Sequence, residues 1–292
     1  MTSRRAWALA LALLWTSPTA AAEVQDMLGR QVSVPSSVTR VVSLAPSLTE
    51  SVYAVGAGDR LVGVTQFCDF PGDAATKPKV GGIYTPNLEA ILSLRPDVVL
   101  ATTEGNREEH IRALERVGLA VYVVRPIDFA SVVESIARVG RLLGRDAAAG
   151  RLVASMRWEA EAISRALDGR PRPRVLYVVW GVPLIVPGRH TLITDLIRRA
   201  GGESVTGEEP LDYPRFSVEE ALGRRPDRVV LALHRDASAD ERLREWQHLT
   251  LLPAVRQGRV HAVDGDLVHR PGPRIVDGLR ALARLLHPEV AW

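Results

Sequence analysis

The stretch Asp146-Ala-Ala-Ala-Gly-Arg-Leu-Val-Ala-Ser-Met-Arg-Trp-Glu-Ala-Glu-Ala-Ile-Ser-Arg-Ala-Leu-Asp168 predicts one long helix near the middle of the chain. It contains no proline and is rich in alanine, arginine, leucine and glutamate, which favour helix. Its apolar residues recur at helical spacing and would share one face: Leu152, Met156, Ala160, Ile163 and Leu167. Asp146 is a suitable N-cap, and Gly169 followed by Pro171 ends the segment. At ~1.5 Å per residue the helix would span roughly 35 Å, enough to connect two domains.

Two similar segments flank this helix, at residues 88–100 and 218–230. Six positions are identical at a constant offset of 130: Glu89/Glu219, Leu92/Leu222, Arg95/Arg225, Pro96/Pro226, Asp97/Asp227 and Val99/Val229. In each copy a short helix opens with glutamate, is ended by Arg-Pro-Asp, and leads into an apolar strand. A second correspondence relates Thr49-Glu50 to Thr194-Asp195 at an offset of 145. The repeats predict two related lobes, residues 23–145 and 169–292, joined by the helix 146–168.

Short apolar strands alternate with helical segments in both halves. Strands are expected near 41–44, 61–65, 98–101 and 121–124, and again near 175–179, 229–233 and 260–263. Helices are expected near 49–55, 108–117, 194–200 and 275–286, and a hairpin with Gly29 in its turn near 23–35. The alternation predicts an α/β protein with two lobes, each a mainly parallel sheet flanked by helices and bridged by one long helix.

Composition indicates an exported globular protein. The chain has 292 residues, 46% hydrophobic and 24% charged, which is typical of a soluble fold. Arg4 and Arg5 precede an apolar run and then three alanines, so residues 1–22 are expected to be a secretory signal peptide for the bacterial periplasm. Without these residues the charge is nearly balanced, which argues against a nucleic-acid partner. One cysteine, Cys68, excludes an internal disulfide, and its role stays open.

The sequence carries no recognisable catalytic motif. It has no Gly-x-Ser-x-Gly, phosphate loop, His-Glu-x-x-His or Cys-x-x-Cys, so no enzyme, metal site or cofactor is expected. The informative residues lie in loops after strands, where open α/β sheets bind ligands. Four aromatic residues occupy such loops, Phe67, Tyr84, Trp180 and Tyr213, whereas Phe70 is expected to bury in its own lobe. Aromatic walls suit a large, flat, partly apolar ligand held between the lobes.

Several motifs resemble one family of transport proteins. Ser43-Leu-Ala-Pro-Ser-Leu-Thr-Glu50, Val62-Gly-Val64 leading to Asp69-Phe-Pro71, and Asn87-Leu-Glu89 followed by Pro96-Asp-Val-Val99 resemble the class III periplasmic binding proteins of ABC importers. These carry cobalamin, haem or ferric siderophores, and the likeness is greatest to members that bind cobalamin. The resemblance implies two α/β lobes bridged by a single long helix, and a monomer that binds its ligand without catalysis.

The resemblance also implies roles for particular residues. Family ligand contacts fall on Phe67, Tyr84, Trp180, Tyr213, Asp266 and Arg270. Family glutamates that pair with arginines of the membrane permease subunits fall on Glu89 and Glu219. In the second copy Ser217 and Glu220 form a capping-box pattern, which leaves Glu219 free to point outward. The expected ligand is a corrinoid. Two alternatives are a haem or siderophore receptor, with Tyr84, Tyr213 or His269 on iron, and an exported hydrolase that uses a histidine with Asp266 or Asp69.

Overall fold

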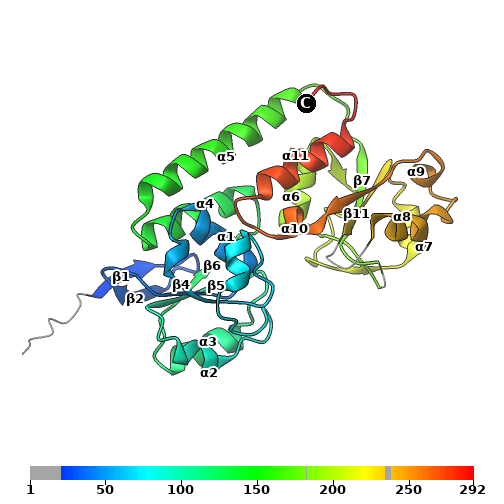
Figure 1. The fold of residues 1–292 in the computed structure, drawn as a ribbon. Helices are drawn as coiled ribbons and strands as arrows, with labels where there is room; N and C mark the ends of the chain where they lie inside the picture. Colours follow the sequence, from blue (N-terminus) through cyan, green and yellow to red (C-terminus); the bar gives the residue numbers. More distant parts are fainter. Residues whose placement is uncertain (1–20, 182, 234–237) are drawn as a thin grey trace, which may run out of the picture.

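The computed structural model describes residues 21–181, 183–233 and 238–292 (Figure 1). The predicted signal peptide therefore lies outside the described residues except for Ala21 and Ala22. These two residues begin strand β1 (Ala21–Gln25), which pairs antiparallel with β2 (Gln31–Pro35). Gly29 takes a φ of 79° in the intervening turn, so the predicted hairpin is confirmed.

The N-terminal lobe is built on a four-stranded parallel sheet in the order β4-β3-β5-β6. Its strands are β3 (Val41–Ser43), β4 (Leu61–Val64), β5 (Val98–Thr102) and β6 (Val121–Val124). Alternate residues face opposite sides, so Val98 and Leu100 pack with α1 (Pro46–Ala54) and α4 (Phe129–Leu142). Val99 and Ala101 instead pack with α2 (Leu88–Ser93) and α3 (Glu108–Arg116). Both faces of the sheet are covered, as the apolar strands require.

The C-terminal lobe repeats this plan with strand order β12-β11-β7-β9, all parallel. The strands are β7 (Arg174–Val178), β9 (Glu203–Ser204), β11 (Arg228–Leu233) and β12 (Val260–Asp264). One face packs on α6 (Leu192–Arg199) and α11 (Ile275–Leu286). The other packs on α7 (Val218–Gly223), α8 (Ala239–Gln247) and α9 (Pro253–Arg256). Strands β8 (Leu184–Ile185) and β10 (Arg215–Phe216) pair antiparallel in a separate two-stranded sheet. Both strands lie between β7 and β11 in the sequence.

The predicted bridging helix is α5 (Asp146–Ala166), the long helix that spans the two lobes in Figure 1. Its predicted apolar face is buried at Met156, Ala160 and Ile163, and belongs to one apolar cluster that runs from the α1/α4 side of the first lobe to the α6/α11 side of the second. Capping by Asp146 was wrong. Arg145 is the N-cap, with no side-chain bond, and Asp146 is the first helical residue, because the Arg145 N–H is still bonded to the Gly140 carbonyl of α4 at 2.7 Å. Gly169 ends the segment with a φ of 69°.

The Arg-Pro-Asp repeat has the same structure in both lobes. Arg95 and Arg225 have φ values of 44° and 47°, and they are the non-glycine residues with positive φ in the described chain. The aspartates that follow each accept a hydrogen bond from the backbone where a sheet strand begins, at β3 in the first lobe and at β7 in the second. The Asp97 carboxylate accepts the Arg40 N–H at 2.8 Å, and the Asp227 carboxylate accepts the Arg174 N–H at 2.8 Å. The duplicated sequence thus corresponds to a duplicated structural unit.

Two further predictions differ slightly from the structure. Helix α1 begins at Pro46 instead of residue 49, because proline is compatible with the first turn of a helix. Phe70 does not bury in its own lobe. The residue is 46% exposed, and the Arg274 guanidinium of the other lobe lies 4.2 Å from the centre of its ring.

Candidate ligand cleft between the lobes

Loops of both lobes line two cavities, of about 750 and about 450 Å³. Tyr84, Glu104, His269 and Pro271 line both, so the cavities are adjoining parts of one cleft. The six predicted ligand residues all line it: Phe67, Tyr84, Trp180, Tyr213, Asp266 and Arg270. The structure therefore brings the predicted residues together at one place.

The first lobe contributes two aromatic side chains, Phe67 (41% exposed) and Tyr84 (61% exposed). Tyr84 lies in a tight turn whose start requires glycine. Gly81 has a φ of 95°, and a Cβ there would lie 2.6 Å from the Thr85 carbonyl oxygen. The buried amide of Asn106 donates to the carbonyls of Ile83 and Leu44 at 2.9 and 3.1 Å. This amide ties the turn to the end of the sheet, so Tyr84 is presented from a fixed support.

The second lobe contributes Trp180 (47% exposed) and Tyr213 (45% exposed). The backbone of Trp180 pairs with Ile185, whose N–H donates to the Trp180 carbonyl at 2.8 Å. The loop carrying Tyr213 is held by the Gly188 N–H, which donates to the Asp212 carbonyl at 2.7 Å. Each lobe thus exposes two aromatic rings on backbone that is hydrogen-bonded to its own lobe.

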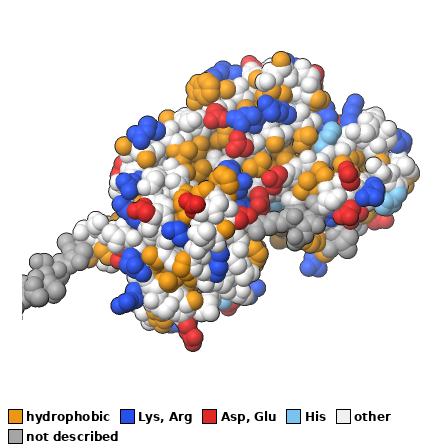
Figure 2. All heavy atoms as spheres, in the orientation of Figure 1, with side chains coloured by type: hydrophobic (Ala, Val, Ile, Leu, Met, Phe, Trp, Pro, Cys, Tyr) orange, Lys and Arg blue, Asp and Glu red, His pale blue; other side chains and the backbone are white. Residues whose placement is uncertain are grey.

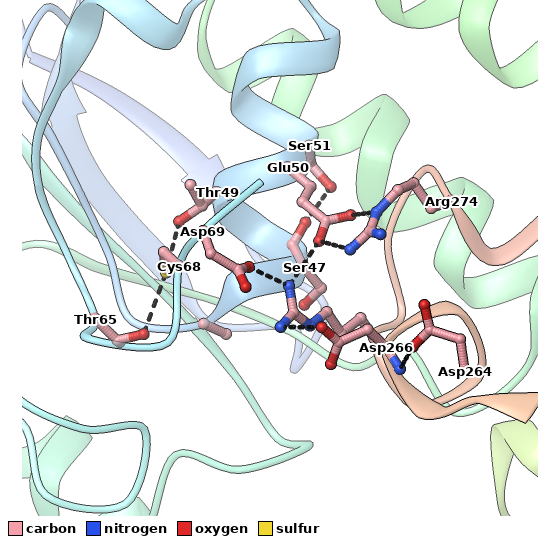
Figure 3. Close-up of polar contacts among 12 residues, drawn as sticks. Ser47, Thr49, Glu50, Ser51, Thr65, Cys68, Asp69, Asp264, Asp266 and Arg274 are labelled. Carbon is pink, nitrogen blue, oxygen red and sulfur yellow. Dashed lines mark hydrogen bonds and ion pairs between the residues drawn. The ribbon is translucent and has the colours of Figure 1, made fainter. Parts of the chain in front are cut away.

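Asp266 and Arg270 belong to an ion network that joins the lobes (Figure 3). The Arg270 guanidinium contacts Asp266 at 2.6 Å, and it contacts Asp69 and Glu50 of the first lobe at 2.7 and 3.3 Å. Arg274 donates to both Glu50 oxygens, at 2.9 and 2.7 Å. The Glu50 side chain is 3% exposed, and the Arg270 side chain is 10% exposed. Arg270 is already paired with carboxylates, so its visible role is to fasten the lobes.

The two lobes also touch at two further places. A Cβ at Gly272 would lie 3.1 Å from the Ser47 carbonyl oxygen, so the backbones of the two lobes are in close contact there.

At a second place, the Phe129 N–H at the start of α4 donates to the Asp195 carboxylate of α6 at 3.0 Å. Burial favours a higher pKa for Asp195, but the Phe129 bond and the Arg199 and Arg198 side chains outweigh it and lower the pKa.

Two carboxylates that sequence reasoning did not select face the larger cavity, Glu104 and Asp212. Burial and the Asp212 charge raise the pKa of Glu104, against the Thr103 hydroxyl and Arg125, which lower it. Desolvation, Glu104 and Asp212 raise the pKa of Tyr213. Asp212 directly precedes Tyr213, which the sequence had singled out, and Glu104 lies two residues after the end of β5. A charged residue just after a strand was the available signal for Glu104.

His269 also lines both cavities, where its Nε2 lies 3.0 Å from the hydroxyl of the buried Tyr177. Within residues 21–181, 183–233 and 238–292, no three His, Cys, Asp or Glu side chains are grouped to hold a metal ion.

None of the helices in the described part of the chain has the length and apolar character of a membrane-spanning segment. Figure 2 shows basic and acidic side chains interspersed over the visible face of the molecule.

Glu89 and Glu219 are exposed, and each is the second residue of a short helix, α2 or α7. The predicted capping box of α7 is confirmed. The Glu220 N–H donates to the Ser217 hydroxyl at 3.1 Å, and the Ser217 N–H donates to the Glu220 carboxylate at 2.6 Å. Glu219 takes no part in it, so its carboxylate has no capping function.

We compared the sequence with models of known protein families. A model of the periplasmic binding protein family matches residues 41–267. The chain belongs to this family. It is 28% identical over 243 residues to a vitamin B12-binding protein of Vibrio parahaemolyticus, which covers 83% of this chain and 87% of that protein. A second relative, an ABC transporter substrate-binding lipoprotein of Bacillus subtilis, is 29% identical over 273 residues, which cover 91% of this chain and 85% of that protein.

Solved structures of this family share the fold. The vitamin B12 binding protein BtuF of Vibrio cholerae superposes with a TM-score of 0.78 at 25% identity, over 86% of this chain and 97% of that one. A periplasmic heme binding protein from Pseudomonas aeruginosa gives a TM-score of 0.75 at 29% identity, over 87% and 94%. The two-lobed fold with a bridging helix is thus confirmed, and this periplasmic binding protein is of the type that includes both vitamin B12 and heme receptors.

Proposed function

We propose that this protein captures a corrinoid, such as cobalamin, in the cleft and delivers it to an ABC importer without catalysing a reaction. The observation that carries the proposal is the pair of aromatic walls. Phe67 and Tyr84 come from one lobe and Trp180 and Tyr213 from the other, around adjoining cavities of about 750 and 450 Å³. Rings on opposite walls suit the two faces of a flat macrocycle. The similarity to vitamin B12-binding proteins supports the same ligand class.

Calorimetric titration with cyanocobalamin tests this proposal. We expect one site with micromolar or tighter affinity, and quenching of tryptophan fluorescence because Trp180 lines the cleft. Trp180→Phe should remove most of the quenching. Trp158→Phe is the matched control, since Trp158 lies on α5 and is 65% exposed. Absence of heat with every cobalamin form, together with binding of hemin or a siderophore, would refute the corrinoid assignment.

A heme ligand is the second candidate, because three side chains suited to iron line the cleft: Tyr84, Tyr213 and His269. Structural neighbours include heme-binding proteins. Hemin titration followed by the absorbance of an iron–tyrosinate or iron–histidine complex separates the two candidates. If heme is the ligand, Tyr84→Phe, Tyr213→Phe or His269→Ala abolishes that spectrum. If a corrinoid is the ligand, hemin binds weakly and no single substitution changes its spectrum.

We further propose that Glu89 and Glu219 dock the protein on the permease. They are exposed, occupy equivalent positions in the two lobes, and Glu219 is free of the capping box. Truncating one member of a desolvated charge pair typically costs ~2–5 kcal/mol. The double variant Glu89→Ala/Glu219→Ala should keep its ligand affinity and lose most transport, whereas Glu109→Ala, an exposed first-turn glutamate of α3, should transport normally. Normal transport by the double variant would reduce both residues to helix-start charges.

We also propose that residues 1–22 direct export to the periplasm and are then removed. The basic residues, apolar run and small residues at the end of this segment support this. N-terminal sequencing of protein recovered from the periplasmic fraction should begin at Glu23. A start at Met1 in that fraction would contradict the proposed cleavage.

A further inference from the structure

Glu104 and Asp212 are carboxylates that the two lobes direct toward the same cavity. Glu104 follows β5 of the first lobe, and its N–H donates to the Thr102 hydroxyl at 3.2 Å. Asp212 precedes Tyr213 in the second lobe, in a loop fixed by the Gly188 bond described above. Both line the larger cavity, and Glu104 also lines the smaller one. The two side chains are therefore positioned by separate, supported pieces of backbone and not by each other.

The cleft does not neutralise this pair. Within the described chain, neither Glu104 nor Asp212 forms an ion pair with an arginine or lysine. Arg107 lines the same cavity, but it contacts Glu109 at 3.4 Å. Arg270 is shared among three carboxylates. Arg125 acts on Glu104 as a nearby charge, and the pKa of Glu104 is raised by burial and by the Asp212 charge, against the Thr103 hydroxyl and Arg125. Among the described residues that line the cleft, the carboxylates of Glu104, Asp212 and Asp266 therefore outnumber the guanidinium groups of Arg107 and Arg270.

A pair of carboxylates can distinguish flat macrocycles by the polar groups that each macrocycle carries on its rim. Carboxylates accept strong hydrogen bonds from N–H donors, and they repel other carboxylates. A corrinoid rim carries primary amides, which donate N–H groups, whereas the heme rim carries propionates. Specificity against a competitor often comes from charges that only the competitor meets unfavourably.

We propose that Glu104 and Asp212 are specificity-determining residues that favour an amide-bearing macrocycle and exclude a carboxylate-bearing one. This inference rests on the proposed corrinoid-binding function and adds which part of the ligand the protein recognises, the polar groups on the rim of the ring. The aromatic walls bind the faces of the ring and accept either class. The two carboxylates, one from each lobe, contact the groups on the rim of the ring, so both lobes contribute to the choice of ligand.

The test compares two corrins and one porphyrin, whose rims carry either amides or carboxylates. Binding of cyanocobalamin, of a cobyrinic acid whose amides are replaced by carboxylates, and of hemin is measured for the wild type and for Glu104→Gln/Asp212→Asn. The control is Glu108→Gln, which removes the same charge from an exposed residue of α3 paired with Arg112. We expect the double variant to gain affinity for cobyrinic acid relative to cyanocobalamin by roughly tenfold or more, the change expected when one like-charge contact is removed. Hemin affinity should rise in the same direction, and Glu108→Gln should keep the wild-type ratio.

Two failures are distinguishable. If the wild type binds cyanocobalamin and the double variant keeps the wild-type ratio of affinities, the carboxylates do not select the rim, and the corrinoid function stands. If the wild type binds no corrinoid, the proposed function fails, and this inference fails with it. Circular dichroism of each variant confirms that the lobes remain folded, which is expected because both side chains lie at the surface of the cleft.

Discussion

Glu50 provides the sharpest test of how the two lobes are held together. It is a buried carboxylate of α1 that accepts hydrogen bonds from two arginines of the other lobe. Glu50→Gln keeps the shape of the side chain and removes its charge. Arg270 would keep Asp69 and Asp266, whereas Arg274 has no other carboxylate partner among the described residues. The loss therefore falls mainly on Arg274, whose pKa is raised chiefly by its hydrogen bond to Glu50, against an opposing effect of burial.

The magnitude follows from this geometry. Removing one partner of a buried ion pair costs ~3–5 kcal/mol, because the other charge is left without compensation. The Arg274 side chain is 20% exposed and also lies over Phe70, so we expect the lower end, about 3 kcal/mol. At ~2.1 cal/mol/K of unfolding entropy per residue, this corresponds for a chain of 292 residues to a fall in Tm of roughly 5 °C.

Thermal unfolding followed by circular dichroism measures this change. The matched control is Glu134→Gln, which breaks an exposed pair with Arg138 on α4 and should cost at most about 1 kcal/mol. In the double variant Glu50→Gln/Arg274→Gln part of the stability should return, because the uncompensated cation is also gone. A Tm for Glu50→Gln equal to that of the control, or a strictly additive double variant, would refute the reasoning.

Three further predictions concern the cleft and its closure. Trp180→Ala should weaken corrinoid binding at least severalfold, since one aromatic contact is worth ~0.5–1.5 kcal/mol beyond its buried area; affinity equal to wild type would remove Trp180 from the site. X-ray scattering with and without ligand should give nearly superimposable profiles, because α5 contains no proline and the lobes are in contact at both Glu50 and Asp195; a large compaction would contradict this. The lowered pKa of Asp195 means that its ionised form stabilises the fold above its unfolded pKa of about 4, and that this stabilisation is lost as pH falls through the folded pKa. The Tm difference between wild type and Asp195→Asn should therefore be constant near neutral pH and shrink in acid; a difference that persists in acid would show that the charge is not involved.

The elements of the fold were predictable because each depends on local pattern. The apolar strands, the helical spacing of α5 and the duplicated Arg-Pro-Asp segment are all readable from short stretches. The aromatic walls were predictable because loops after parallel strands collect at one end of each sheet. Capping by Asp146 failed, since several backbone conformations suit that sequence and the α4–α5 turn selects one of them.

The contacts between the lobes could not be predicted in the same way. Glu50 and Arg274 are 224 positions apart, and no spacing rule relates them. The helix pattern gave no such signal, because Glu50 lies two residues from both Leu48 and Val52, on the opposite side of α1 from these buried residues. Glu104 and Asp212 were missed because a single carboxylate in a loop is usually solvated, and only the placement of both lobes shows that they face one cavity.

The repeat nevertheless explains these contacts once the structure is known. Glu50 and Asp195 correspond at the offset of 145, and so do Phe129 and Arg274. In each lobe the acidic residue of the first helix contacts the other lobe where a later helix begins, at Arg274 before α11 or at Phe129 of α4. The two junctions are therefore related copies with different chemistry, one using guanidinium groups and the other a backbone N–H. Because the lobes are fastened at two related positions beneath the bridging helix, opening the cleft requires breaking one junction or bending α5. This arrangement favours a cleft of nearly constant width, in which ligand choice depends on the side chains that line it more than on domain closure.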